Sequence, residues 1–154
     1  MNIDDLQAKD LPAVERIAQS CFAHGAWSAK QYLQQIESER SVALGLYAPD
    51  LIGYVMFSQV LDEAELLQIA IDPAHQGCGY AQLLVSQGAQ QLQNAGVIRV
   101  MLEVRESNLA AIALYDKSGF VTEGVRKNYY PSVQGGQRED AVLMGMSIEP
   151  VLCN

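Results

Sequence analysis

A glycine-rich turn that leads directly into a helix places the strongest constraint on how this chain folds. Residues 64–71, AELLQIAI, have the composition of a strand, and residues 72–79, DPAHQGCG, form a turn before an amphipathic segment. Gly77 and Gly79 can adopt the positive φ angles that a tight turn requires. The backbone N–H groups of such a turn, with those of the first helical turn, can surround an anion. The pattern therefore indicates either a phosphate site or an ordinary strand-to-helix connection.

The order of the remaining segments predicts a mixed α/β domain with one central sheet. Residues 42–71 contain three strand-like segments joined by short turns, which favours three antiparallel neighbours. After the glycine-rich turn the chain alternates helix, strand and helix, and it ends on two strand-like segments. We therefore expect residues 1–154 to form a single domain. The expected helices cover residues 11–22 after the cap Asp10, 29–38 after the cap Ser28, 79–95 and 109–118, and the expected strands cover residues 42–48, 51–61, 64–71, 98–104, 120–127 and 141–148.

Composition and charge exclude several classes of protein. No apolar run reaches the roughly 18 residues that a membrane span needs. The first ten residues, MNIDDLQAKD, lack the basic and apolar segments of a signal peptide, so we expect a cytoplasmic protein. The net charge of -8 disfavours nucleic acid as a direct partner, and it indicates either a basic partner or a contribution to solubility alone. The cysteines and histidines do not show the spacing of a metal site, and the sequence leaves the oligomeric state open.

The residues after the glycines exclude two familiar phosphate-binding loops. A P-loop requires Lys followed by Ser or Thr after its second glycine, where this chain has Tyr80 and Ala81. A dinucleotide-binding loop requires a small residue where this chain has Gln82. The pattern Gln-x-x-Gly-x-Ala, preceded by LLQIAIDP, instead resembles the pyrophosphate-binding loop of the GNAT family of N-acetyltransferases.

Resemblance to the GNAT family implies a fold and a cofactor. The fold is a central, mostly antiparallel sheet with a splayed parallel strand pair, flanked by helices, and the cofactor is acetyl-CoA. The strand at residues 69–71 would pair with the pantetheine arm and offer a backbone N–H to the acetyl carbonyl. Because no lysine or arginine lies between Arg40 and Arg99, we expect N–H groups of residues 77–82 to hold the pyrophosphate, with little salt dependence. The residues expected to bind acetyl-CoA are Ile69, Ala70, Ile71, Gln76, Gly77, Cys78, Gly79, Tyr80, Ala81, Gln82 and Asn108.

Glu103 and Tyr115 are the candidates for proton transfer. Acetylating an amine requires a base that takes the amine proton and an acid that protonates the leaving thiolate. Glu103 lies at the end of the apolar segment IRVMLEV, and Tyr115 lies seven residues after Asn108, on the same face of the expected helix. Taken alone, the two are more typical of an exposed strand end and of a helix core. Their position beside the glycine-rich turn favours the catalytic interpretation.

The resemblance is most specific at residues 102–120, which read LEVRESNLAAIALYDKSGF and are followed by NYYP and REDAVLM. This segment is similar to the bacterial GNAT enzymes that acetylate the N-terminal alanine of a small-subunit ribosomal protein, and the similarity runs from about Asp10 to Met146. It implies that Glu103 is the general base and Tyr115 the general acid. It also implies that the partner is the basic N-terminal tail of a ribosomal protein.

The residues that contact the substrate are the part of the site that the sequence predicts least. The resemblance implies that Trp27, Tyr129 and Tyr130 contact the peptide, while the acidic segment 62–65 either attracts a basic partner or is a solvated turn. Cys78 could carry an acetyl group, although direct transfer needs no such intermediate.

Two alternative functions stay open: a GNAT enzyme that acetylates small amines or internal lysines, and a non-catalytic acyl-CoA-binding module.

Overall fold

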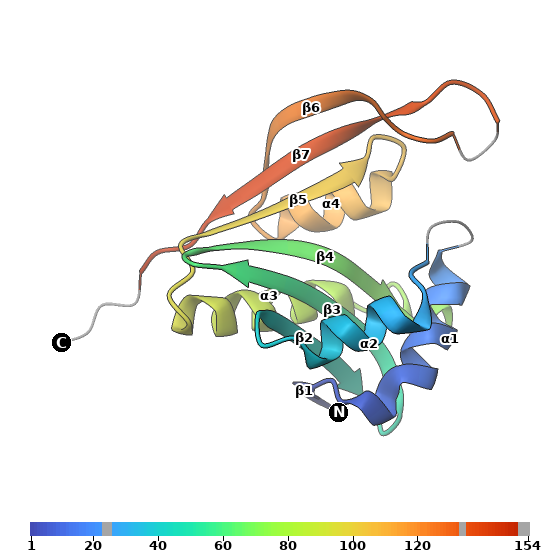
Figure 1. The fold of residues 1–154 in the computed structure, drawn as a ribbon, viewed down its shortest axis with the longest axis vertical. Coiled ribbons are helices and arrows are strands. Elements are labelled where there is room, and N and C mark those ends of the chain that lie inside the picture. The colour runs from blue at the N-terminus through green and yellow to red at the C-terminus, as the bar shows by residue number, and fades with distance from the viewer. Residues whose placement is uncertain (23–25, 133–134, 151–154) are drawn as a thin grey trace.

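A seven-stranded sheet forms the centre of the molecule (Figure 1). The computed structural model describes residues 1–22, 26–132 and 135–150. Neighbouring strands run antiparallel except β4 and β5, which pair in parallel. The expected α/β class and the mostly antiparallel sheet with one parallel pair are therefore confirmed. In spatial order the strands are β1 Asn2–Asp5, β2 Ser41–Tyr47, β3 Leu51–Val60, β4 Glu63–Ile71, β5 Arg99–Arg105, β7 Glu139–Ser147 and β6 Val121–Tyr130.

Helices cover both faces of the sheet (Figure 1). The alternation of side chains along a strand separates two cores: in β3, Val55 and Phe57 join one cluster, and Tyr54 and Met56 join the other. The cluster of Tyr54 and Met56 includes apolar residues of α1 and α2, and the cluster of Phe57 includes those of α3 and α4. The helices are α1 Leu11–Cys21, α2 Ala29–Glu37, α3 Tyr80–Asn94 and α4 Leu109–Lys117.

Strands β4 and β5 diverge toward their C-terminal ends (Figure 1). They pair only from Glu63 to Glu65 and from Arg99 to Met101, and β4 shifts register against β3 beside Phe57. A bulge of this kind bends a strand and increases its local twist. The second half of β4 therefore has a backbone edge that β5 does not occupy.

The chain between β4 and α3 follows the geometry that its glycines predict. The short 3-10 helix η2, Pro73–His75, begins where the Asp72 carboxylate accepts a hydrogen bond from the Ala74 N–H at 3.0 Å. Gly77 and Gly79 have φ angles of 80° and 82°, a region that other residues rarely adopt. Helix α3 starts immediately after Gly79, so its N-terminus opens beside the end of β4.

The N-terminal segment differs from expectation in two respects. Residues 2–5 form β1, which pairs with β2, although their sequence NIDD has no strand signal of its own. Asp10 precedes α1 but its carboxylate does not cap that helix; it accepts hydrogen bonds from the Gln7 N–H at 2.8 Å and the Tyr47 hydroxyl at 2.9 Å. Ser28 caps α2 as predicted, accepting from the Gln31 N–H at 3.2 Å. No helix in the described part of the chain is long and apolar enough to cross a membrane.

Candidate active site

A cavity of about 470 Å³ opens where β4 and β5 separate. Its walls are the last residues of β4, the turn that follows, the first turn of α3 and one side of α4. The predicted acetyl-CoA residues line it with one exception: Cys78 is exposed outside the lining, with its thiol 3.9 Å from the carbonyl oxygen of Gln76. Those that line the cavity are Ile69, Ala70, Ile71, Gln76, Gly77, Gly79, Tyr80, Ala81, Gln82 and Asn108.

The turn presents a run of unpaired backbone N–H groups to this cavity. Within the described residues, the N–H groups of residues 77–82 donate to no backbone or side-chain acceptor, and no side chain caps the start of α3. A Cβ atom added at Gly77 or Gly79 would meet nothing within 4 Å. The arrangement combines free donors with the positive end of a 15-residue helix. It is suited to an anionic group such as a pyrophosphate.

Gln76 contributes to this turn by holding it against the sheet. Its side-chain amide donates to the carbonyl oxygen of Ile71 at 2.9 Å, and the thiol of Cys21 donates to the same oxygen at 3.1 Å. Burial raises the pKa of the Cys21 thiol, so the group stays protonated as a donor. The last residue of β4 is thereby tied to α1 and to the glycine-rich turn. Gln76 thus shapes the cavity with its side chain as well as lining it.

Helix α4 supplies the opposite wall, including a cation that the sequence did not predict there. Asn108 caps the helix by accepting a hydrogen bond from the Ala111 N–H at 3.2 Å. Leu114 and Lys117 follow along the same side, and both line the cavity. Lys117 is the one lysine or arginine among the described lining residues. Lys117 is three residues after Leu114 and seven after Ala110, which line the same cavity, but nothing in the local sequence says which face of the helix meets the turn.

Glu103 lies outside this cavity, in a groove of about 290 Å³ along the side of β5 that the helices leave uncovered. Its carboxylate forms an ion pair with Arg126 of β6 at 3.5 Å. Glu65 of β4 lines the same groove, and burial, followed by the nearby Glu103 charge, raises the pKa of Glu65. In the sequence, Glu65 stands out only as part of an acidic segment, residues 62–65. The groove therefore contains two interacting carboxylates that share one cation: Arg126 pairs with Glu103 and partly offsets the raised pKa of Glu65.

Tyr115 is buried in the core between α4 and the sheet, 7% exposed, with its ring 5.8 Å from that of Phe120. Burial, with a smaller contribution from Tyr130, raises the pKa of Tyr115 to about 12. Among the described residues no hydrogen bond joins the Tyr115 hydroxyl to Glu103, whose carboxylate pairs with Arg126 instead. Tyr130 interacts electrostatically with both, because Glu103 also contributes to the raised pKa of Tyr130, after burial.

The three residues predicted to contact the peptide do not all lie close together. Tyr129 and Tyr130 pack edge to face at the end of β6, with ring centroids 5.0 Å apart, and Arg126 lies over the Tyr129 ring at 5.3 Å. Trp27 is on the other side of the β4–β5 opening, stacked on Tyr32 at 5.2 Å at the start of α2. Trp27 lines a groove along α2 together with Leu67 of β4, and this groove contains neither Tyr129 nor Tyr130.

Comparison with known proteins places this geometry in a family. The chain is 42% identical over 147 residues to the [ribosomal protein bS18]-alanine N-acetyltransferase of Salmonella typhimurium, covering 95% of this chain and 97% of that protein. It is 40% identical over the same length to the enzyme of that name from Escherichia coli K12. The crystal structure of the ribosomal-protein-S18-alanine N-acetyltransferase from Escherichia coli superimposes with a TM-score of 0.89 at 36% identity, covering 99% of this chain and 97% of that one. Residues 11–120 match the model of the Acetyltransferase (GNAT) family. The chain belongs to the GNAT family of acetyltransferases.

Proposed function

We propose that this chain is a single-domain N-α-acetyltransferase that moves the acetyl group of acetyl-CoA to the N-terminal alanine of a small-subunit ribosomal protein. The observation that carries this proposal is the identity of about 42% to a bS18-alanine N-acetyltransferase over nearly the whole length of both proteins. Such a substrate places the reaction in the cytoplasm, where ribosomes are assembled.

The large cavity fits acetyl-CoA. The free N–H groups of residues 77–82 would hold the pyrophosphate, and the edge of β4 that β5 does not occupy, at residues 69–71, would pair with the pantetheine arm. Acetyl-CoA supplies an activated acetyl thioester when it is bound. The separation of β4 from β5 lets this arm reach from the helix side of the sheet toward the groove that contains Glu103. Donors and a free strand edge at one cavity support acetyl-CoA as the cofactor.

Glu103 and Tyr115 are proposed to move the two protons. Glu103 would take a proton from the incoming ammonium group, directly or through water, because it lies in an open groove that a peptide can enter. Tyr115 would donate its proton to the leaving sulfur, since its raised pKa keeps the hydroxyl protonated throughout the physiological range. The two groups also differ in their surroundings: the Glu103 side chain is partly exposed in a groove and paired with Arg126, whereas Tyr115 is buried in the core.

The charge of the chain suits a basic peptide. Residues 1–98 carry eleven Asp and Glu against four Lys and Arg, and one of these acids, Glu65 of β4, lines the groove that contains Glu103. A negative field of this kind accelerates association with a basic tail and disfavours direct binding to nucleic acid. We therefore propose the basic N-terminal tail of the ribosomal protein as the partner.

The test is thiol release from acetyl-CoA in the presence of a short basic peptide with a free N-terminal alanine. The matched control is the same peptide with its N-terminus blocked, which keeps every side chain but removes the acceptor amine. Turnover with the free peptide only is expected. Equal turnover with the blocked peptide would show that the enzyme acetylates internal lysines instead of the N-terminus. Binding of acetyl-CoA without turnover on either peptide would contradict the proposal, and a panel of polyamines would then test small amines.

Replacing Lys117 with Gln is expected to weaken acetyl-CoA binding by about two- to fivefold, the scale of one exposed ion pair. The side chain is exposed and lines the same cavity as Gly77 and Gly79, so it can approach phosphate oxygens. Titration calorimetry at low and high salt measures the effect. Added salt should weaken the wild type slightly and the variant still less.

The matched control is Lys30→Gln, which removes the same charge from the exposed side of α2. An unchanged affinity in Lys117→Gln would assign phosphate binding to the backbone N–H groups alone. A steep salt dependence that survives in the variant would require another cation.

A further inference from the structure

Arg105 ends β5, two positions after Glu103, and it lies on the same side of the sheet. Successive side chains of a strand alternate between its two faces. On β5 the opposite face carries Val100, Leu102 and Val104, which are buried in the core beneath α3 and α4. The Arg105 side chain is 29% exposed, which is low for an arginine at the end of a strand. Its guanidinium group is shielded because it has several partners on the β6–β7 hairpin.

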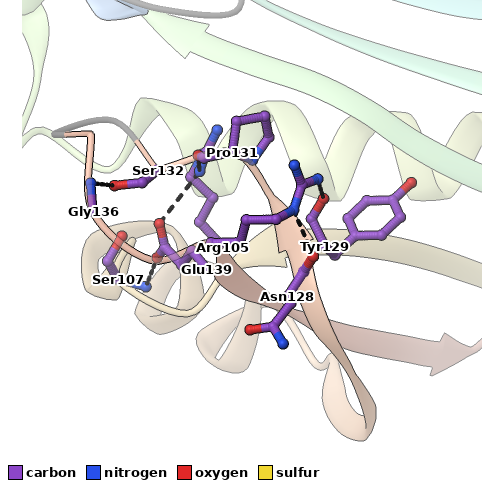
Figure 2. Close-up of polar contacts among 9 residues, drawn as sticks. Arg105, Ser107, Asn128, Tyr129, Pro131, Ser132, Gly136 and Glu139 are labelled. Atoms are coloured by element: carbon purple, nitrogen blue, oxygen red, sulfur yellow. Dashed lines mark hydrogen bonds and ion pairs between the residues drawn. The ribbon is translucent and has the colours of Figure 1, made fainter.

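Three groups of that hairpin hold the Arg105 guanidinium. Figure 2 shows Nη1 donating to the carbonyl oxygen of Pro131 at 2.9 Å and pairing with Oε2 of Glu139 at 3.3 Å. The guanidinium carbon also lies over the ring of Tyr130, 4.5 Å from its centroid. One side chain therefore contacts the last residue of β6, the residue that follows it and the first residue of β7.

Glu139 extends this network to the start of α4. Its second carboxylate oxygen, Oε1, accepts a hydrogen bond from the Ser107 N–H at 2.6 Å (Figure 2). Hydrogen bonds from Ser107, and then the contact with Arg105, hold the pKa of Glu139 below its ordinary value. Ser107 immediately precedes Asn108, the cap of α4, whose side chain lines the large cavity. The network thus joins the hairpin to the helix that forms one wall of that cavity.

Tyr130 is the part of the network nearest the proposed chemistry, because its ring packs on the Arg105 guanidinium at 4.5 Å and Arg105 lies two positions from Glu103 on the same side of β5. The charge of Glu103 also contributes to the raised pKa of Tyr130, after burial. We propose that Arg105 is a positioning residue that fixes Tyr130 and Pro131 beside Glu103 as one wall of the site for the peptide. This inference deepens the proposed function and rests on it. Arg105 does not line the acetyl-CoA cavity, so its effect should fall on the peptide.

An arginine suits this task better than a lysine. A guanidinium group is planar, so it can stack on a ring while its N–H groups bind a carbonyl and a carboxylate in the same plane. A lysine ammonium can replace the ion pair with Glu139 but has no flat face for Tyr130. Arg105→Lys therefore separates the charge of the side chain from its shape.

The first experiment measures KM for the alanine peptide and KM for acetyl-CoA in Arg105→Gln and Arg105→Lys. We expect the peptide KM to rise about tenfold in Arg105→Gln, with most of that rise present in Arg105→Lys, and the acetyl-CoA KM to stay within about twofold. The matched control is Arg40→Gln, which removes one exposed positive charge distant in the fold. A rise of both KM values by the same factor, or neither, would overturn the assignment.

A double-mutant cycle tests whether Arg105 acts through Tyr130. Tyr130→Leu should raise the peptide KM as Arg105→Gln does, while Tyr130→Phe, which keeps the stacked ring, should restore most of the affinity. Combining Arg105→Gln with Tyr130→Leu should be no worse than the more damaging single change, because both remove one arrangement. Additive effects would show that Arg105 does not act through Tyr130 and would overturn the proposal.

Amide hydrogen exchange separates failure of this inference from failure of the proposed function. Measured without substrate, exchange across residues 126–130 should be about tenfold faster in Arg105→Gln than in the wild type and unchanged in Arg40→Gln. If the wild type does not acetylate the alanine peptide, the proposed function fails and exchange still decides whether Arg105 fixes this segment. Unchanged exchange in Arg105→Gln would overturn the positioning role.

Discussion

Tyr115→Phe is expected to lower turnover by about 10²-fold or more while leaving acetyl-CoA affinity nearly unchanged. The phenyl ring keeps the packing on Phe120 in the buried core, so only the proton donor is removed. Tyr115 is not among the residues that line the acetyl-CoA cavity, which is why binding should survive. Steady-state kinetics with the alanine peptide, combined with titration calorimetry for acetyl-CoA, measure the two quantities separately.

The pH profile gives a second check on Tyr115. A raised pKa favours the neutral phenol, so Tyr115 retains its proton until the pH approaches about 12. Ionisation of Tyr115 should therefore not lower the wild-type rate between about pH 7 and pH 10. A Phe variant with wild-type turnover would remove Tyr115 from the mechanism. A loss confined to acetyl-CoA affinity would make it a binding residue instead.

The parts of the fold that the sequence predicted are those whose signals are local. The three antiparallel strands β2 to β4, the cap at Ser28 and the positive φ angles of Gly77 and Gly79 all follow from short stretches. Strand β1 could not be predicted in the same way. Its four residues, mostly polar, are held in place by pairing with β2, which lies nearly 40 residues away in the sequence.

The candidate site likewise contains residues that local sequence predicts and residues that only tertiary structure brings together. Residues 69–71 and 76–82 adjoin one another in the chain, so one motif located most of a cavity wall. Lys117 reaches that cavity only because α4 packs across from the turn. Glu65 meets Glu103 because β4 and β5 pair in parallel, and the Arg105 network depends on where the β6–β7 hairpin lies. Such contacts follow from tertiary structure, for which a single sequence offers no periodic signal.

Glu103→Gln is expected to lower kcat/KM for the peptide by about 10²-fold near pH 7, and by less as the pH rises. An α-amino group has a pKa of about 7.7 to 8.0, so at higher pH more of the substrate loses its proton without a base. Glutamine keeps the shape of the side chain, and Arg126, left without its partner, is 55% exposed and can be solvated. Rates measured across the pH range in the wild type and the variant test this expectation.

Glu65→Gln is the decisive comparison, because Glu65 lies in the same groove and its raised pKa also favours proton transfer near neutral pH. If Glu103 is the base, Glu65→Gln should cost much less and should keep the shape of the wild-type pH profile. If Glu65→Gln causes the larger loss and Glu103→Gln is nearly silent, the proton goes to Glu65 instead. In that case the pairing of Glu103 with Arg126 would serve to place charge beside Glu65.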